Sequence, residues 1–243
     1  MCTNYTPSSR DRLRAARLGF MHLPPADWPP EVYPGYEAPI IVRGGAPGQH
    51  DAAPRCLLAR FGLVPRWSRD AAHAKELSRH TTNARSETAA VKPSFRSPWR
   101  ERHWALAPME NFFEPCWETG HAVRWRIACA GGGLFAGAGL WERWTDPASG
   151  EITASFTLLT VNADGHPLMA RMHRPGDEKR MPVLLAPHEF DDWLHATDEQ
   201  AHAMVRGMSA LALTGEPAPR PPPPRAVRRT APPPAPDDTP SLF

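Results

Sequence analysis

Stretches rich in apolar and β-branched residues fill the middle of this chain, and they constrain its fold more than any other feature. Each has the length and composition of a strand, and few helical segments separate them. A doubly wound parallel sheet needs strands and helices in alternation. The observed order therefore favours an α+β fold with a mixed, largely antiparallel, barrel-like sheet. The predicted strands cover residues 38–44, 55–65, 103–108, 124–131, 132–144, 154–163 and 181–187.

Helical patterns lie near the two ends of this region. Residues 11–23 indicate one helix, and residues 186–196 and 197–208 indicate two more. Thr197, with Gln200 three positions later, is typical of a capping box at the start of the last helix. We expect these helices to flank the sheet.

The C-terminal segment differs from the rest in its proline content. The chain has 30 prolines among 243 residues, and many of them lie in residues 215–243. This segment has almost no apolar periodicity, which predicts a disordered, extended tail. We therefore expect one domain over residues 1–214 and a tail over residues 215–243. Its arginines are either simply solvated or form a weak arm for nucleic acid or another, unknown partner.

Charge and hydropathy exclude several classes of protein. The formal net charge is only +2, so any nucleic-acid surface must be a local patch. No apolar run reaches the roughly 18 residues of a membrane span, and the N-terminus carries no signal-peptide pattern. We expect a cytoplasmic, nucleoid-associated protein that binds no membrane. Nothing in the sequence predicts an assembly element such as a coiled coil, so we expect a monomer.

The four cysteines are Cys2, Cys56, Cys116 and Cys129, and no two have the C-x-x-C spacing of a zinc ribbon or redox motif. In a reducing cytosol all four should be free thiols. We predict no metal ion and no cofactor.

Cys2 follows the initiator methionine directly. Its small side chain would let an aminopeptidase remove Met1, and the chain would then begin with an amine and a thiol on adjacent carbons. Such a pair can attack an aldehyde twice and close a five-membered ring. The alternative is a chance cysteine at a position that tolerates most residues.

The polar stretch 79–90, "RHTTNARSETAA", contains Asn83 and Arg85. The planar guanidinium of Arg85 suits a phosphate, and Asn83 could hold a polar substrate group or a terminal amine. The alternative is an ordinary loop before a helix.

The stretch 107–117, "APMENFFEPCW", places Glu114 among aromatic residues. Partial desolvation would raise the pKa of this carboxyl and suit it to general acid–base work. The alternative is a carboxylate exposed at a strand edge.

Two further stretches hold candidate residues. His173 lies in a basic, turn-rich segment with Arg174 and Arg180, where phosphate contacts are expected and where a histidine could exchange protons near pH 7. Otherwise His173 is a surface residue. Trp67 ends the motif "FGLVPRW" and is either a core residue or an exposed ring that stacks on a base.

Taken together and in order, these segments resemble the SRAP family, the SOS-response-associated peptidase domain. The motifs are the initial "MC", "FGLVPRW", "TTNARSET", "APMENFFEPCW", "TLLTVNA" and "MHRPGDEKRMPVLL", which span most of residues 1–194. The resemblance implies a single α+β domain with a groove for single-stranded DNA. It also implies binding to abasic sites in that DNA and a covalent DNA–protein cross-link, a thiazolidine, that shields the lesion during the DNA damage response.

The resemblance also implies roles for single residues. Cys2 would be the cross-linking residue, Asn83 would lie near its amine and the sugar, and Glu114 and His173 would be catalytic. The resemblance also implies that Trp67 and Arg85 contact DNA. The basic stretch after His173 adds Arg174 and Arg180 as predicted DNA-binding residues.

This chain departs from the family pattern at three places. Asn4 stands where many members have an arginine, and Ser68 follows Trp67 where some members have a second tryptophan. The segment between His173 and "RMP" is longer than the near-immediate "HDRMP" of relatives.

Two other functions stay open at this point. Cys2 could be the nucleophile of a thiol peptidase or N-terminal nucleophile hydrolase, an activity that the resemblance limits to removal of Met1. The protein could also bind single-stranded or modified DNA without covalent chemistry. A lyase reaction at the abasic site could compete with cross-linking.

Overall fold

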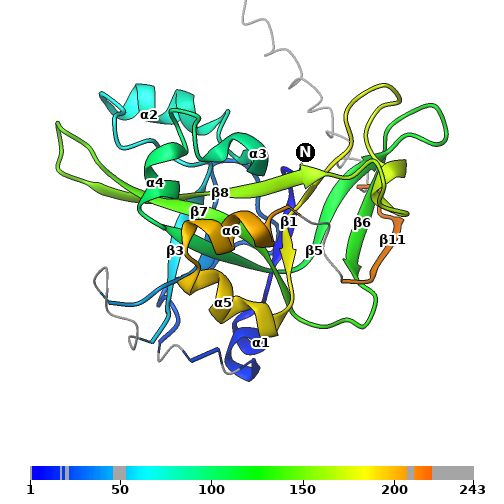
Figure 1. Cartoon of the computed structure of the whole chain (residues 1–243), viewed down its shortest axis with the longest axis horizontal. Helices are drawn as coiled ribbons and strands as arrows, with labels where there is room; N and C mark the ends of the chain where they lie inside the picture. The colour runs from blue at the N-terminus through cyan, green and yellow to red at the C-terminus, as the bar shows by residue number, and fades with distance from the viewer. Residues whose placement is uncertain (1, 17, 20–21, 46–52, 207–210, 221–243) are drawn as a thin grey trace, which may run out of the picture.

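A closed ring of strands lies at the centre of the computed structural model, which describes residues 2–16, 18–19, 22–45, 53–206 and 211–220 (Figure 1). Strand β5 pairs with both β2 and β7, so the hydrogen-bonded order β5-β7-β8-β3-β2 returns to β5. The β3–β8 pair is parallel and the other four contacts of the ring are antiparallel. The ring strands are β2 (Glu37–Val42), β3 (Arg55–Phe61), β5 (Trp104–Cys116), β7 (Phe135–Thr145) and β8 (Ile152–Asn162).

The predicted α+β class with a mixed, largely antiparallel barrel is therefore confirmed. The main difference concerns the strand expected at 103–108, which continues as β5 to Cys116. The segment predicted as one strand at 181–187 is divided into β9 (Arg180–Pro182) and β10 (Leu184–Leu185). The extension of β5 matters for function because it carries Glu114.

Short strands outside the ring bring distant segments together. β1 (Tyr5–Pro7) pairs with β5, and β4 (Asn83–Arg85) pairs in parallel with β8. β9 pairs with the same β8 segment, so Thr160 lies opposite both Arg85 and Pro182. β6 (Val123–Cys129) continues the sheet from β5, and β11 (Leu213–Pro217) continues it from β6.

Helices cover the barrel on two sides. In Figure 1, α5 (Phe190–His195) and α6 (Asp198–Met204) lie in front of the ring, and α2 (Ala71–Ser78), α3 (Ser86–Ala89) and α4 (Arg96–Arg100) gather at the upper left. Single-turn 3-10 helices form at Met169–Arg171 and Pro187–Glu189.

The capping box predicted at Thr197 and Gln200 is confirmed, with Gln200 N donating to Thr197 Oγ1 at 3.2 Å and Thr197 N donating to Gln200 Oε1 at 2.8 Å. The helix expected over residues 11–23 is shorter, because α1 (Arg10–Ala15) ends at Ala15 and Gly19 has a φ of +80°. Sequence analysis did not predict α2, which Asp70 caps by accepting a hydrogen bond from His73 N at 2.8 Å.

Aromatic residues pack the core and attach the helices to the barrel. Phe61 stacks on Phe156, and Tyr5 meets Phe61 edge to face. The indole of Trp104 donates to the carbonyl of Ala196 at 2.9 Å, which joins β5 to the end of α5. These contacts fix the barrel wall on which the candidate site lies.

Strand β11 runs to Pro217, three residues past the boundary that we predicted at 214. Most of the predicted tail, residues 221–243, lies outside the described residues. No helix among the described residues has the length and apolar character needed to cross a membrane.

Candidate active site

Cys2 lies inside the protein beside the start of β1, with its side chain fully buried. Asn83 Nδ2 donates a hydrogen bond to the carbonyl of Cys2 at 2.8 Å, and Phe113 N donates to the carbonyl of Asn4 at 2.9 Å. Pairing of β1 with β5 and the side chain of Asn83 on β4 therefore hold the first residues of the chain in the core.

Asn83 offers a second polar atom in the same place. Its Oδ1 is buried and has no hydrogen-bond partner among the described residues. An amide oxygen accepts hydrogen bonds only, so this atom suits a donor such as an amine or a hydroxyl group. The orientation is fixed because the amide nitrogen is held by the Cys2 carbonyl.

Glu114 lies on the far half of β5 and is almost completely buried. Burial raises the pKa of its carboxyl from the ordinary value of 4.5 to about 7. Burial, followed by the negative charge of Glu114, also raises the pKa of the Cys2 thiol. The carboxyl and the thiol therefore interact electrostatically, and both favour their protonated forms.

The imidazole ring of His173 faces the carboxyl group of Glu114. Its Nδ1 lies 3.6 Å from Glu114 Oε2, and its backbone N donates to the carbonyl of Pro115 at 2.7 Å. His173 has a φ of +62°, a left-handed conformation that costs energy for a non-glycine residue. The hydrogen bond to the backbone of β5 helps to hold this conformation and directs the ring toward the carboxyl.

The hydrogen bonding of His173 assigns its tautomer. Nε2 lies 3.0 Å from the carbonyl of Arg180, which can only accept, so Nε2 carries a hydrogen. Burial lowers the pKa of this imidazole, which favours the neutral ring with a lone pair on Nδ1. A proton-accepting Nδ1 thus faces a carboxyl whose pKa is about 7, an arrangement suited to moving protons at neutral pH.

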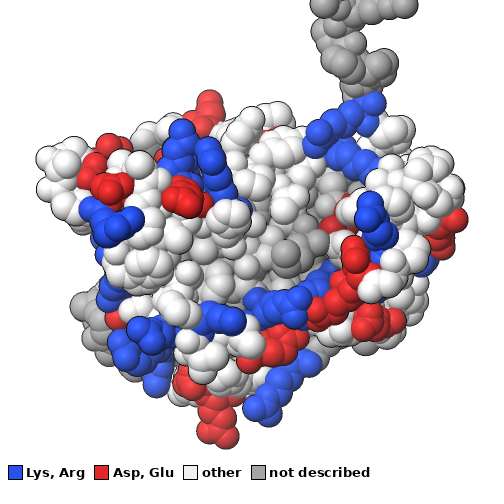
Figure 2. Space-filling model, turned by 90° about the horizontal axis from the view of Figure 1, so that it is seen from above, with Lys and Arg blue, Asp and Glu red and all other residues white. Residues whose placement is uncertain are grey.

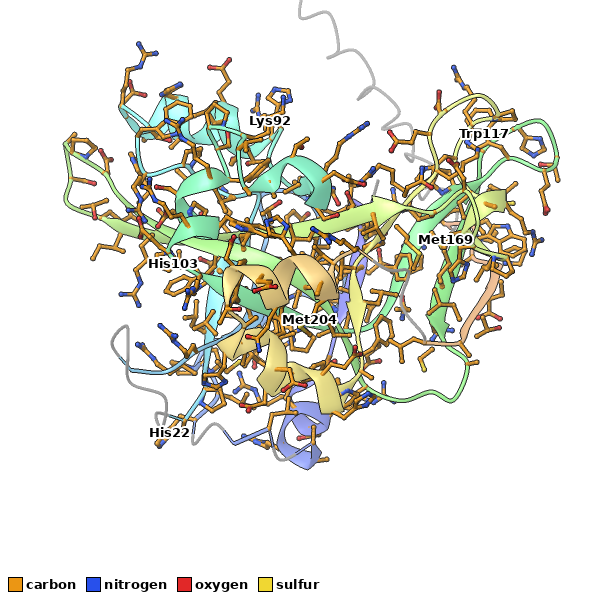
Figure 3. The ribbon with its side chains drawn as sticks, in the orientation of Figure 1. His22, Lys92, His103, Trp117, Met169 and Met204 are labelled. Atoms are coloured by element: carbon orange, nitrogen blue, oxygen red, sulfur yellow. The ribbon has the colours of Figure 1, made fainter. Side chains whose placement is uncertain are left out.

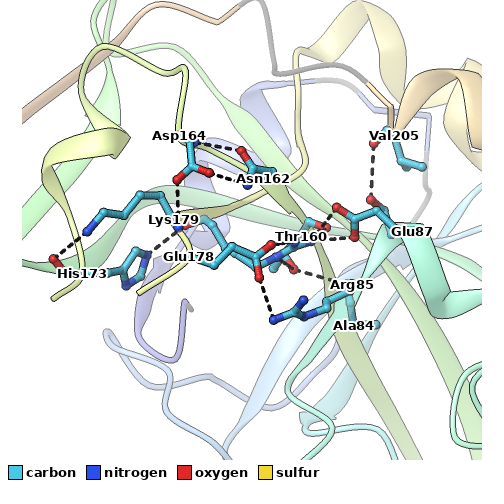
Figure 4. Close-up of polar contacts among 12 residues, drawn as sticks. Ala84, Arg85, Glu87, Thr160, Asn162, Asp164, His173, Glu178, Lys179 and Val205 are labelled. Carbon is cyan, nitrogen blue, oxygen red and sulfur yellow. Dashed lines mark hydrogen bonds and ion pairs between the residues drawn. The ribbon is translucent and has the colours of Figure 1, made fainter. Parts of the chain in front are cut away.

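Four charged residues form a second feature, here called the ion-pair strip: Arg85, Glu87, Glu178 and Arg180. Figure 4 shows Arg85 and Glu178 side by side, with Arg85 Nη2 2.8 Å from Glu178 Oε2. Arg180 Nη1 lies 2.6 Å from Glu178 Oε1, and its Nη2 lies 2.8 Å from Glu87 Oε2. One carboxylate, Glu178, therefore bridges two arginines.

The two arginines of this strip differ in exposure. The side chain of Arg85 is 54% exposed, whereas that of Arg180 is 3% exposed. Arg180 also donates to the hydroxyl of Thr160 at 3.2 Å and to its carbonyl at 2.6 Å. Its guanidinium is thus a buried centre of the strip rather than the free surface cation that the basic sequence suggested.

The other two predicted DNA-binding residues lie apart from each other. Trp67 is 47% exposed and precedes α2, at the upper left of Figure 1. Arg174 is exposed and lies over the ring of Trp117, at 4.9 Å from the centroid, and Figure 3 places Trp117 on the opposite side of the same view. The residues predicted to contact DNA therefore lie on opposite sides of the molecule and do not form one cluster around Cys2.

Sequence analysis missed Arg124, which lies beside residue 4. Its Nη2 donates to Asn4 Oδ1 at 2.7 Å and to Glu31 Oε2 at 2.9 Å, and its guanidinium lies 3.3 Å from the centroid of Phe113. A guanidinium from β6 therefore contacts the side chain of Asn4. No local pattern could reveal this, because only the pairing of β5 with β6 brings residue 124 to residue 4.

Sequence analysis also missed Tyr5. Its side chain is fully buried, and its hydroxyl has no hydrogen-bond partner among the described residues. Burial, followed by the charge of Cys2, raises the pKa of this phenol, so it keeps its proton at neutral pH.

The charges of one face are shown in Figure 2. Its middle is made largely of uncharged residues, and Lys and Arg (blue) lie beside Asp and Glu (red) around the margin. Basic residues drawn on this face do not merge into one continuous patch, which agrees with the small net charge of +2. Any contact with a polyanion on this face would thus involve separate arginines rather than a bulk field.

A closed mixed barrel with a buried cysteine at its second position, next to an asparagine, a glutamate and a histidine, defines the class of protein. The family model described as "SOS response associated peptidase (SRAP)" matches residues 1–217. The chain belongs to the SRAP family, as the motifs in the sequence predicted.

Individual relatives agree with this assignment. The chain is 31% identical over 139 residues to the abasic site processing protein YoqW of Bacillus subtilis, covering 56% of this chain and 55% of that protein. It is 27% identical over 190 residues to the abasic site processing protein HMCES of Gallus gallus, covering 67% of this chain and 53% of that protein. The alignments thus span about half the length of these relatives.

Solved structures extend the likeness over most of the fold. A crystal structure of a Bordetella bronchiseptica protein matches with a TM-score of 0.77 at 32% identity, covering 89% of this chain and 99% of that one. A Bacteroides thetaiotaomicron protein shares the fold, with a TM-score of 0.74 at 23% identity over 88% of this chain and 90% of that one.

Proposed function

We propose that this protein binds abasic sites in single-stranded DNA and, once Met1 is removed, captures them covalently through Cys2. The product is a thiazolidine DNA–protein cross-link that shields the lesion. The observation that carries the proposal is the burial of Cys2 beside Asn83 and Glu114, with His173 facing Glu114. This group of four residues is here called the pocket. The names of the relatives YoqW and HMCES, both abasic site processing proteins, support the substrate.

The chemistry begins with the terminal amine of Cys2. The reference pKa of such an amine is about 7.7–8.0, so a useful fraction is neutral at cellular pH. This amine attacks C1′ of the open-chain sugar aldehyde, and loss of one water gives an imine. The thiol then adds across the C=N bond, sulfur bonds to C1′ and the thiol proton passes to nitrogen. The overall reaction releases one water and closes the five-membered ring.

The pocket residues supply the protons for these steps. A Glu114 carboxyl with a pKa near 7 could donate a proton to the departing water and accept one from the thiol. His173, neutral and with Nδ1 toward Glu114, could return Glu114 to its starting state. The unpaired Oδ1 of Asn83 would accept a hydrogen bond from the amine or a sugar hydroxyl.

The raised pKa of the Cys2 thiol distinguishes this proposal from a thiol peptidase. A peptidase of that type attacks an amide with a thiolate, and its cysteine needs a lowered pKa. Here burial and Glu114 raise the pKa of the thiol instead. Amine-first capture needs no preformed thiolate, so the electrostatics favour it over a peptidase or another Cys2-dependent hydrolase.

The DNA strand would reach the pocket along separate contacts. We assign Arg85 and Arg174 to phosphates and Trp67 to stacking on a base, because all three side chains are exposed. Arg180 would act by holding the ion-pair strip in place. A DNA-processing role also implies an intracellular location near the nucleoid, and we expect the protein to work as a monomer.

The test is a denaturing gel of the full chain mixed with a single-stranded oligonucleotide that carries one abasic site. Mass spectrometry first confirms that Met1 is absent. We expect a heat-stable band whose mass is the sum of protein and DNA less one water, and no band with Cys2→Ala. An oligonucleotide whose abasic aldehyde has been reduced to an alcohol should give none either.

No band from the wild-type protein with a free N-terminus would overturn the proposal. A band that survives Cys2→Ala would assign the covalent bond to another residue. Strand cleavage without a lasting band would indicate that lyase chemistry outcompetes cross-linking.

A further inference from the structure

We infer that Glu178 is a built-in competitor for the DNA backbone, a carboxylate that occupies the phosphate-binding side of Arg85 in the free protein. This inference rests on the proposed function. In this role Glu178 weakens the binding of intact single-stranded DNA. The abasic site is then selected by the covalent reaction with Cys2 and not by a higher affinity for the DNA.

The contacts of Glu178 resemble those of a bound phosphate. Its two oxygens contact two different guanidinium groups, Oε2 with Arg85 at 2.8 Å and Oε1 with Arg180 at 2.6 Å (Figure 4). Hydrogen bonding to Arg180 is the main cause that lowers the pKa of Glu178, so the carboxylate is ionised at neutral pH. A DNA phosphate would present the same charge and the same kind of acceptor oxygens to Arg85.

The two arginines depend on Glu178 to different degrees, so a phosphate can displace Glu178 from Arg85 without leaving Arg180 unpaired. Arg180 keeps Glu87 and both oxygens of Thr160 as partners when Glu178 moves away. For Arg85, Glu178 is the ion-pair partner found among the described residues. Departure of Glu178 would therefore release an exposed guanidinium at Arg85 while Arg180 stays neutralised.

Only the side chain of Glu178 needs to move. The following residue, Lys179, is fixed, because its Nζ donates to the carbonyls of His173 and Arg174 at 3.1 and 2.9 Å, and its backbone N donates to Asp164 Oδ1 at 3.2 Å. The Glu178 side chain is 36% exposed and can rotate into solvent. Partly exposed ion pairs of this kind are weak, so a phosphate can replace the carboxylate.

Glu178 lies in the segment of six residues between His173 and Arg180. Here the segment "RPGDEK" puts a carboxylate in front of Arg180 and within reach of Arg85.

The test measures affinity for an intact single-stranded oligonucleotide by fluorescence anisotropy. We expect Glu178→Gln to bind about three- to tenfold more tightly than wild type. The matched control is Asp177→Asn, which removes one negative charge from the adjacent exposed residue. It should change affinity less than about twofold, the size of a screened surface effect. In an Arg85→Gln background, Glu178→Gln should have no more effect than the control.

Equal affinities of Glu178→Gln and Asp177→Asn would overturn the inference, as would a Glu178→Gln effect that persists without Arg85. Absence of intact-DNA binding by every variant would overturn it as well. Thermal melting checks each fold, and Glu178→Ala serves as the second variant if the glutamine form is unstable. The cross-linking gel keeps the two proposals apart. Cross-linking by wild type with no Glu178 effect removes only this inference, and tight intact-DNA binding without cross-linking removes only the proposed function.

Discussion

Glu114 in the pocket and Glu178 in the ion-pair strip are the same residue type with opposite behaviour. Glu114 is buried, and its pKa is raised to about 7. Glu178 is partly exposed beside Arg180 and Arg85, and its pKa is lowered. The first carboxyl is kept near its titration point, and the second is kept as a permanent anion.

The two carboxyls show how surroundings suit one residue type to two different tasks. A group that exchanges protons near pH 7 needs a pKa close to that pH, and burial raises the pKa of Glu114 to about 7. A group that positions or competes with a phosphate must keep its charge, as in the strip. Burial is the main cause of the raised pKa at the first kind of site, and neighbouring arginines lower the pKa at the second.

The largest effect expected is the loss of proton transfer in the pocket. Glu114→Gln should slow cross-linking at pH 7 by about 100-fold or more, because general acid–base groups contribute on this order. Binding to intact DNA should be unchanged. Single-turnover gels measure the rate. Glu110→Gln, on the same strand but partly exposed, is the control, and equal rates for the two variants would remove Glu114 from the chemistry.

A second change tests the structural role of the buried arginine. Arg180→Ala removes a side chain that is 3% exposed and takes away a hydrogen-bond donor from the carbonyl of Thr160, so it should lower the free energy of unfolding by about 1–3 kcal/mol. Arg85→Ala, at the exposed end of the same strip, should lower it by less than about 1 kcal/mol. Urea denaturation gives both values. Similar losses would mean that the two arginines are not divided into structural and binding roles.

The pH dependence of stability tests the buried carboxyl directly. The folded pKa of Glu114 is about 7 against 4.5 for the free side chain. Its contribution is therefore fully present below pH 4.5 and is lost as pH rises to 7. The loss should amount to roughly 3 kcal/mol between pH 4.5 and 8. Glu114→Gln should abolish this part of the decrease in unfolding free energy. An unchanged profile in denaturant titrations at several pH values would show that the carboxyl is not desolvated.

The smallest effect concerns the exposed aromatic ring. Trp67→Ala should weaken binding to intact single-stranded DNA by about 1 kcal/mol or somewhat more, since a base loses its stacking partner. The pocket chemistry should keep its rate at saturating DNA. Tyr36→Ala is the matched control, because Tyr36 is 48% exposed, close to the 47% of Trp67. Fluorescence anisotropy titrations of both variants measure the affinities. Equal affinities would mean that Trp67 does not stack on a base and is only an exposed surface residue.

Much of this protein could be predicted from local patterns. The strands of the barrel, the capping box at Thr197 and the desolvated surroundings of Glu114 all follow from side chains close together in the chain. Two of the elements that were missed are very short strands. β1 and β4 have three residues each and form only because β5 and β8 are there to pair with them. A three-residue segment has no periodicity to read.

Residue type and order were enough to predict the α+β class and the family, and they suggested the candidate site residues Cys2, Asn83, Glu114 and His173. Only the tertiary structure decided that Cys2 is buried against Asn83, that Arg180 is enclosed, that Arg124 contacts Asn4 and that Glu178 bridges two arginines. The physical reason is range. Element type is set by neighbours a few residues away, whereas burial, pKa and ion pairing are set by contacts between distant segments, such as that of Arg124 with Asn4, 120 residues apart.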